Sequence, residues 1–110
     1  MEKYIIDGKV GVLISTGYGA GWSTWNDDEL ELATDKRVVE KFLQIKKDNI
    51  MQIKKEWESF FAELYPGEYV CVLGADGLNL NYVEQGSYIK IEEYDGHESL
   101  EINFNSFTQL

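Results

Sequence analysis

The chain has 110 residues, with 20 acidic and 10 basic side chains, a formal net charge of -10, and 14% aromatic residues. This length suits a single domain over residues 1–110 and is too short for two. The aromatic content excludes a disordered acidic tail, and the acidic balance excludes direct binding to duplex nucleic acid, which needs clustered Lys and Arg.

The acidity is unevenly distributed along the chain. Residues 1–33 carry six acids and two bases, residues 34–65 carry six and seven, and residues 66–110 carry eight and one. The near-neutral middle is typical of a solvated helix surface. We expect no membrane span and no signal peptide, because the sequence has no long apolar run. A single cysteine, Cys71, cannot form an internal disulfide, and a cytoplasmic location in the host cell is expected.

In chain order, the first predicted element is a buried strand over Lys9–Ser15, which is short, apolar and β-branched. Residues 16–33 are predicted to be a long loop, since they combine glycines, tryptophans and acids without a helix or strand pattern. Loops of this length in a compact domain are uncommon and often functional.

Helical spacing of apolar residues follows from Thr34, the predicted N-cap, to the Pro66-Gly67 stop. Asp48-Asn49 divides this region into two helices, and one long helix is the alternative. Trp57, Phe60 and Phe61 lie at helical spacing and are expected in the core, or at an oligomer seam if the helix packs poorly on the sheet.

The last third of the chain predicts strands separated by turns. The expected strands are Tyr69–Leu73, Leu78–Val83, Ser87–Tyr94 and Glu98–Phe104. Asp95-Gly96 is a strong hairpin signal. The predicted class is therefore α+β, with an N-terminal strand, a helical hairpin or one long helix, and then an antiparallel β-meander.

The loop after the first strand is the most informative segment. Its glycines allow close approach of backbone N–H groups, which can form an anion-binding nest, and its aromatic rings offer faces on which a base stacks. It lacks the Walker and Rossmann spacings. Alternatively, the glycines form a tight bend and Trp22 and Trp25 fill the core. The expected ligand-binding residues are Thr16, Gly17, Tyr18, Gly19, Ala20, Gly21, Trp22, Ser23, Trp25 and Asn26, together with Glu93, Tyr94 and Asp95 of the hairpin.

Two segments carry a resemblance to a known family. Gly-Tyr-Gly-Ala-Gly-Trp-Ser-Thr-Trp-Asn at 17–26 and the Glu-Tyr-Asp-Gly hairpin at 93–96 resemble a family of small phage and prophage-encoded proteins. The resemblance covers the first and last thirds of the chain and implies a role in phage–host conflict, such as an anti-defence protein. It brings no catalytic residue. The two matching segments would make sense as two walls of one pocket.

Signals for catalysis and metal binding are weak. His97 is the only histidine and has no nucleophile beside it in the sequence, so no catalytic residue is assigned. The acidic run Asp27, Asp28, Glu29 and Glu31 could hold a divalent cation, but its spacing matches no EF-hand and suits a helix N-terminus. We expect no metal and no cofactor.

Three functions follow from these observations. The first is a binding protein, acting as a homo-oligomer, that sequesters a nucleotide-derived immune signal. Its pocket would be built on residues 16–26, called the Gly-aromatic loop below. The alternative is an acidic protein inhibitor that imitates nucleic acid and occupies a host nuclease or regulator. The third is a small hydrolase acting on the same ligand, for which only His97, Asp95 or Glu93 is available.

Overall fold

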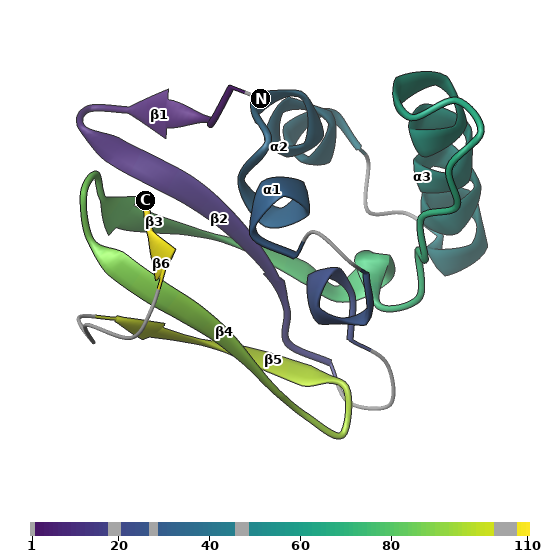
Figure 1. The fold of residues 1–110 in the computed structure, drawn as a ribbon. Helices are drawn as coiled ribbons and strands as arrows, with labels where there is room; N and C mark the ends of the chain where they lie inside the picture. Colours follow the sequence, from purple (N-terminus) through teal and green to yellow (C-terminus); the bar gives the residue numbers. More distant parts are fainter. Residues whose placement is uncertain (1, 18–20, 27–28, 46–48, 103–107) are drawn as a thin grey trace.

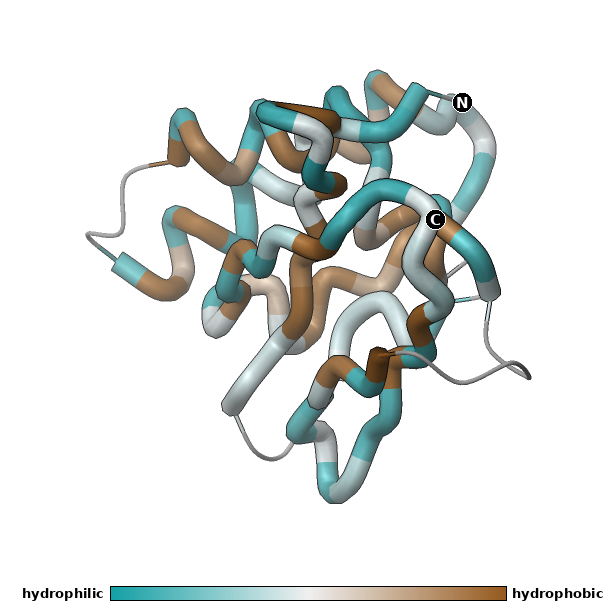
Figure 2. The backbone as a smooth tube through the Cα atoms, turned by 90° about the vertical axis from the view of Figure 1, so that its left-hand side faces the viewer, coloured by the Kyte–Doolittle hydropathy of each residue, from teal (hydrophilic) through white to brown (hydrophobic). Residues whose placement is uncertain are grey.

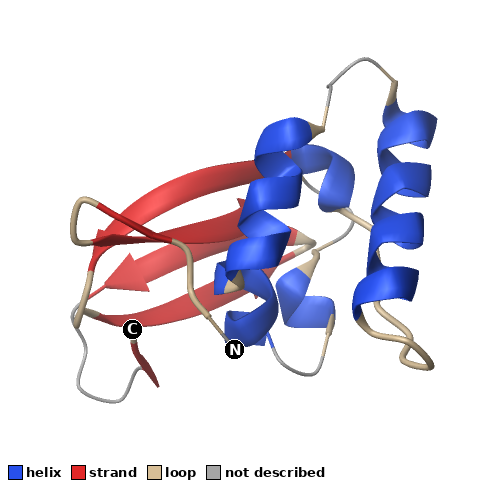
Figure 3. Ribbon diagram, turned by 90° about the horizontal axis from the view of Figure 1, so that it is seen from above, coloured by secondary structure: helices blue, strands red, loops and turns tan. Residues whose placement is uncertain are grey.

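A computed structural model describes residues 2–17, 21–26, 29–45, 49–102 and 108–110. The fold is α+β, which confirms the predicted class (Figure 1). Its elements are β1 (Ile5–Ile6), β2 (Lys9–Ser15), the 3-10 helix η1 (Ser23–Trp25), α1 (Glu29–Thr34), α2 (Lys36–Gln44), α3 (Ile50–Leu64), the 3-10 helix η2 (Ala75–Gly77), β3 (Leu78–Glu84), β4 (Tyr88–Tyr94), β5 (His97–Ile102) and β6 (Thr108–Gln109). Seen from above, the helices gather on one side of the molecule and the strands on the other (Figure 3).

The described strands form two three-stranded antiparallel sheets, in the orders β1-β2-β3 and β5-β4-β6. β2 pairs with β3 along its whole length, from Lys9 opposite Glu84 to Ser15 opposite Leu78. The β4–β5 hairpin turns through Asp95 and Gly96, which both have positive φ, as a tight primed turn requires. The predicted hairpin is confirmed.

β2 is buried on both faces, and this explains its continuous apolar sequence. On one face Val10, Val12 and Ile14 pack with Ile89 and Ile91 of β4. On the other face Leu13 packs with the helices. β2 is therefore the central layer, with the helices on one side and the β4–β5 hairpin on the other.

The helical side of the core is built on aromatic rings from two distant segments. Trp57 and Phe61 of α3 stack with ring centroids 5.3 Å apart, and Trp22 lies 6.1 Å from Trp57. Hydrophobic stretches lie in the middle of the molecule, whereas the hairpin at its lower end is mostly hydrophilic (Figure 2). The predicted core role of Trp57 and Phe61 is confirmed, since both are buried.

The helical region contains two long helices, as the first of the two alternatives predicted. Asn49 caps α3, because its side chain accepts hydrogen bonds from the N–H groups of Met51 and Gln52. The predicted N-cap at Thr34 is wrong, since Thr34 ends α1 and its hydroxyl donates to the carbonyl of Leu30. Asp35 caps α2 instead, accepting from the N–H of Arg37.

Three local expectations are corrected by the structure. Residues 16–33 are not all loop, because they contain η1 and most of α1. Tyr69–Leu73 is not a strand, since the Asn26 side chain, and not a neighbouring strand, pairs with the backbone of Cys71. β1 was not predicted, because only Ile5 and Ile6 belong to it. Phe104, at the predicted end of the last strand, lies outside the described residues.

Asp35 is buried and joins the start of α2 to the end of α3. Its carboxylate accepts from Nε of Arg37 at 3.1 Å, from Nη2 of Arg37 at 2.8 Å and from the hydroxyl of Tyr65 at 3.2 Å. Burial by itself raises the pKa of Asp35, but the hydrogen bonds and charge of Arg37 outweigh it and hold the pKa below the ordinary value of 3.8.

This lowered pKa predicts a pH-dependent contribution to stability. The contribution is present above the unfolded-state pKa of Asp35, near 3.8, and is lost as pH falls through the lower folded-state pKa. Asp35→Asn keeps a capping side chain, so we expect it to cost about 1–2 kcal/mol in urea unfolding at pH 7. The difference from the native protein should shrink below pH 3.8. The exposed Asp76→Asn is the control, and an equal deficit at pH 7 and pH 3 would contradict the assignment.

Candidate functional site

The Gly-aromatic loop and the β4–β5 hairpin meet at a buried carboxylate. Glu98 has no exposed surface. It accepts from the backbone N–H groups of Ser15 at 2.8 Å, Trp22 at 2.9 Å and Thr24 at 3.0 Å, and from the hydroxyl of Thr24 at 2.6 Å. The end of β2 and the loop thus form a nest of N–H donors, and the group that fills that nest is the protein's own side chain.

Two further contacts join the same segments. The Nδ1 atom of His97 lies 2.7 Å from the carbonyl oxygen of Thr16, so the imidazole ring donates from Nδ1. Glu93 accepts from the N–H of Gly96 at 2.7 Å and makes a longer contact of 3.4 Å with the indole N–H of Trp25. The structure therefore brings together the Gly-aromatic loop and the β4–β5 hairpin.

The predicted aromatic platforms of the loop have opposite environments. Trp22 is completely buried in the core beside Trp57 and Phe61, whereas the side chain of Trp25 is 43% exposed. Of the two, only Trp25 presents a face to solvent. Ser23 is also buried, and its hydroxyl has no hydrogen-bond partner among the described residues.

The other predicted residues are distributed as follows. Tyr18, Gly19 and Ala20 lie outside the described residues, as do Asp27 and Asp28 of the acidic run. Thr16 and Gly17 are exposed, and Gly21 packs so tightly that a Cβ atom would lie 2.9 Å from the Thr24 hydroxyl.

The three predicted hairpin residues do not share one face. Tyr94 is 79% exposed, and Asp95 is an exposed turn residue. Neighbouring side chains of a strand alternate between faces, so Tyr94 lies on the face opposite to Glu93. Glu93 alone is directed toward Trp25.

Asn26 connects the end of the loop to the segment after α3. Its amide donates to the carbonyls of Trp22 at 2.8 Å and Cys71 at 3.1 Å, and its carbonyl accepts from the N–H of Cys71 at 2.9 Å. This pairing holds residues 68–71 close to the loop.

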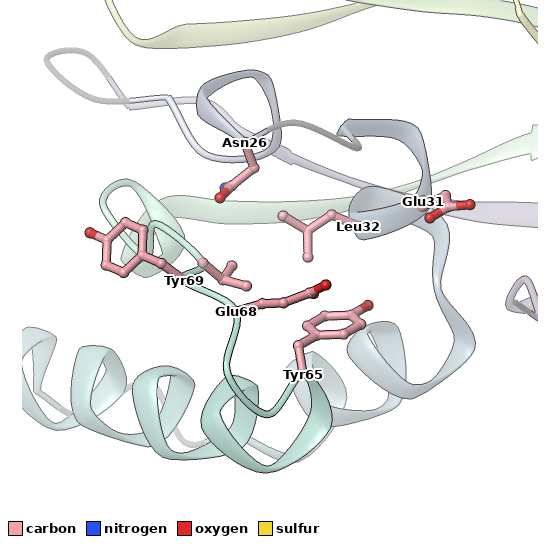
Figure 4. Close-up of a pocket in the computed structure, with 7 residues that line it drawn as sticks. Asn26, Glu31, Leu32, Tyr65, Glu68 and Tyr69 are labelled. Atoms are coloured by element: carbon pink, nitrogen blue, oxygen red, sulfur yellow. The ribbon is translucent and has the colours of Figure 1, made fainter.

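A cleft of about 540 Å³ opens beside Asn26, between α1 and the segment that follows α3 (Figure 4). Leu32 and Val70 are its apolar lining residues. Glu68 runs across the cleft toward the phenol of Tyr65 (Figure 4). The lining residues are Asn26, Glu31, Leu32, Tyr65, Glu68, Tyr69 and Val70. Of these residues, only Asn26 was among the predicted ligand-binding residues. The sequence signal that could have indicated the cleft is the group of aromatic and acidic residues around the Pro66-Gly67 turn.

One wall of the cleft holds a phenol that is hydrogen-bonded to a buried carboxylate. The phenol of Tyr65 donates to the buried carboxylate of Asp35 at 3.2 Å. Burial first, and then the negative charges of Asp35 and Glu31, raise the pKa of Tyr65 to about 12. The phenol therefore stays protonated at neutral pH.

Among the described residues, no group of three or more His, Cys, Asp or Glu side chains is placed to hold a metal ion. Within the same residues, no helix is both long and apolar enough to cross a bilayer. No protein-family model, no curated protein and no solved structure matches the chain.

Proposed function

We propose that this protein is a small-ligand-binding protein that sequesters a nucleotide-derived molecule, and that the ligand occupies the cleft at the end of the Gly-aromatic loop. The observation that carries the proposal is the cleft itself. Its volume of about 540 Å³ is within the range of small-molecule sites, and it combines apolar lining residues with a few convergent polar groups.

The lining suits the base of a nucleotide better than its phosphates. Leu32 and Val70 offer apolar contact to a planar ring, and Tyr69, which is exposed, offers an aromatic face. The carboxylates of Glu31 and Glu68 accept hydrogen bonds from exocyclic amines or ribose hydroxyls. The N–H nest that could cradle a phosphate is filled by Glu98.

Sequestration is favoured over catalysis by the chemistry of the same lining. The seven described lining residues include no Ser, Cys, His or Lys that would act as a nucleophile. The phenol of Tyr65, with a pKa of about 12, is a poor general base near pH 7. In the phage context that the resemblance implies, the bound molecule would be an immune signal held intact.

A thermal-unfolding screen with nucleosides, nucleotides and cyclic nucleotides tests this proposal. A ligand at 100 times its Kd should stabilise the protein by about 2.7 kcal/mol. We expect Tyr69→Ala to reduce the stabilisation and Tyr94→Ala to leave it unchanged; these tyrosines are 88% and 79% exposed, so neither variant disturbs the core. Recovery of intact ligand after heat denaturation would support sequestration, and recovery of a cleaved product would show hydrolysis.

Two results would overturn the proposal. The first is a panel in which no compound raises the unfolding temperature. The second is stabilisation that is lost in Trp25→Ala and retained in Tyr69→Ala, which would move the site to the junction of the loop and the hairpin.

A second candidate, an acidic protein inhibitor, is favoured by the exposed tip of the hairpin. Glu92, Glu93 and Asp95 surround Tyr94 there, and all four side chains are exposed. Such a tip fits a basic groove on a partner protein, where tyrosine is a frequent anchor residue. A complex that dissolves with salt and with Asp95→Lys, but not with Asp76→Lys, would favour this candidate.

A further inference from the structure

We infer that the cleft seats the positively charged part of its ligand, such as a cationic base or an alkylammonium or guanidinium group. This inference rests on the proposed function, because it specifies the chemistry of the ligand for the same cleft. It follows from the charges, rings and hydrogen bonds that line the cleft.

The first step is the balance of charge in the lining. Glu31 and Glu68 are exposed carboxylates, and neither forms an ion pair within the part of the chain that the structure describes. The seven described lining residues include no Lys, Arg or His. Glu68 therefore places a negative charge across the cleft, and Glu31 adds a second one at its rim (Figure 4).

Arg37 is a cation close to Tyr65, and its charge is already paired. Its guanidinium forms two hydrogen bonds with Asp35 and lies 6.0 Å from the ring centroid of Tyr65. Because Arg37 and Asp35 neutralise each other, this pair does not offset the charges of Glu31 and Glu68. A phosphate in the cleft would meet uncompensated repulsion.

The last step is the character of the aromatic rings. Tyrosine faces attract cations through the quadrupole of the ring, and carboxylates beside them add attraction between opposite charges. The ring of Tyr65 already carries Arg37 at 6.0 Å and stacks on Phe61, so the ring open to a ligand is that of Tyr69, at the outer end of the cleft (Figure 4). An exposed aromatic ring with carboxylates near it is suited to an organic cation.

The experiment compares probes that differ in charge and little else. Binding of 1-methyladenosine, whose ring is cationic at neutral pH, is measured beside adenosine by calorimetry at pH 7. We expect tighter binding of the cation, by roughly fivefold, as for a solvent-exposed pair of opposite charges. Agmatine, a cation without a nucleoside, tests whether the charge alone is sufficient, and adenosine monophosphate tests whether a phosphate is excluded.

Variants assign the preference to the cleft. Glu68→Gln removes one charge and keeps the shape, so we expect it to reduce the preference for 1-methyladenosine while adenosine binding remains. Glu84→Gln, at the exposed end of β3 and outside the cleft lining, is the matched control and should change neither. Raised salt should weaken 1-methyladenosine more than adenosine.

The outcomes separate this inference from the proposed function. Equal binding of adenosine and 1-methyladenosine, both dependent on Tyr69, would overturn the cation preference and leave ligand binding intact. Tighter binding of adenosine monophosphate than of adenosine would also overturn it. If agmatine binds and none of the nucleosides binds, the cation site is retained and the nucleotide proposal is overturned. Absence of binding by every probe would contradict both.

Discussion

Glu98→Ala is expected to be the most damaging single change outside the hydrophobic core, with a loss of about 3–4 kcal/mol in the free energy of unfolding. The substitution removes the acceptor for three backbone N–H groups and one hydroxyl, of Ser15, Trp22 and Thr24. The donors of Ser15 and Trp22 belong to buried residues, so their desolvation is left uncompensated. Urea unfolding followed by tryptophan fluorescence measures the loss.

The control is Glu93→Ala, because Glu93 lies directly opposite Glu98 in the β4–β5 register and is exposed. We expect it to cost less than about 1 kcal/mol. Formate or acetate should partly restore the stability of Glu98→Ala, since a small carboxylate can enter the vacated nest, and chloride at equal ionic strength should not. Equal midpoints for Glu98→Ala and Glu93→Ala would contradict the role given to Glu98.

Trp22→Ala is the second large expected effect, with a loss of about 3–5 kcal/mol. The indole is completely buried and packs at ring-centroid distances of 6.1 Å from Trp57 and 6.4 Å from Phe61. Its N–H has no hydrogen-bond partner among the described residues, so Trp22→Phe should cost markedly less than Trp22→Ala. Equilibrium unfolding in urea measures all three proteins.

Trp25→Ala provides the comparison within the same loop. The Trp25 side chain is 43% exposed, and we expect its removal to cost less than about 1 kcal/mol. Similar losses for Trp22→Ala and Trp25→Ala would contradict the packing described here. Because Trp22→Ala destabilises the fold, a loss of ligand binding in this variant would not show that Trp22 contacts the ligand. Binding is therefore better tested at the exposed Tyr69.

The fold class was predictable because its signals are local. β2 has a continuous apolar run, α2 and α3 have helical spacing divided at Asn49, and Asp95-Gly96 forms the hairpin turn. The predicted strand over Tyr69–Leu73 was wrong because of a contact between distant residues. The backbone of Cys71 pairs with the side chain of Asn26, and this pairing replaces the expected strand.

The candidate site was predictable in part, and for a similar reason. The sequence indicated a loop with N–H donors and a hairpin with carboxylates, and the structure brings these two segments together. It did not single out the cleft, because Glu31 lies on α1 whereas Tyr65 and Glu68 lie in the turn after α3, and only the fold brings these segments together. Only Asn26 is common to the predicted site and the cleft.

The sequence by itself determined the acidic balance and the periodicities of the main elements, since each of these depends on residue type and local order. Only the tertiary structure decided that N–H groups of Ser15, Trp22 and Thr24 converge on one carboxylate, and which tryptophan is buried. The carboxylate of Glu98 reaches the N–H of Trp22 across 76 positions of the chain. Trp22 and Trp25 are equivalent by residue type, and packing against α3 places only Trp22 in the core. The group that fills the N–H nest therefore depends on the tertiary fold, which brings Glu98 to it.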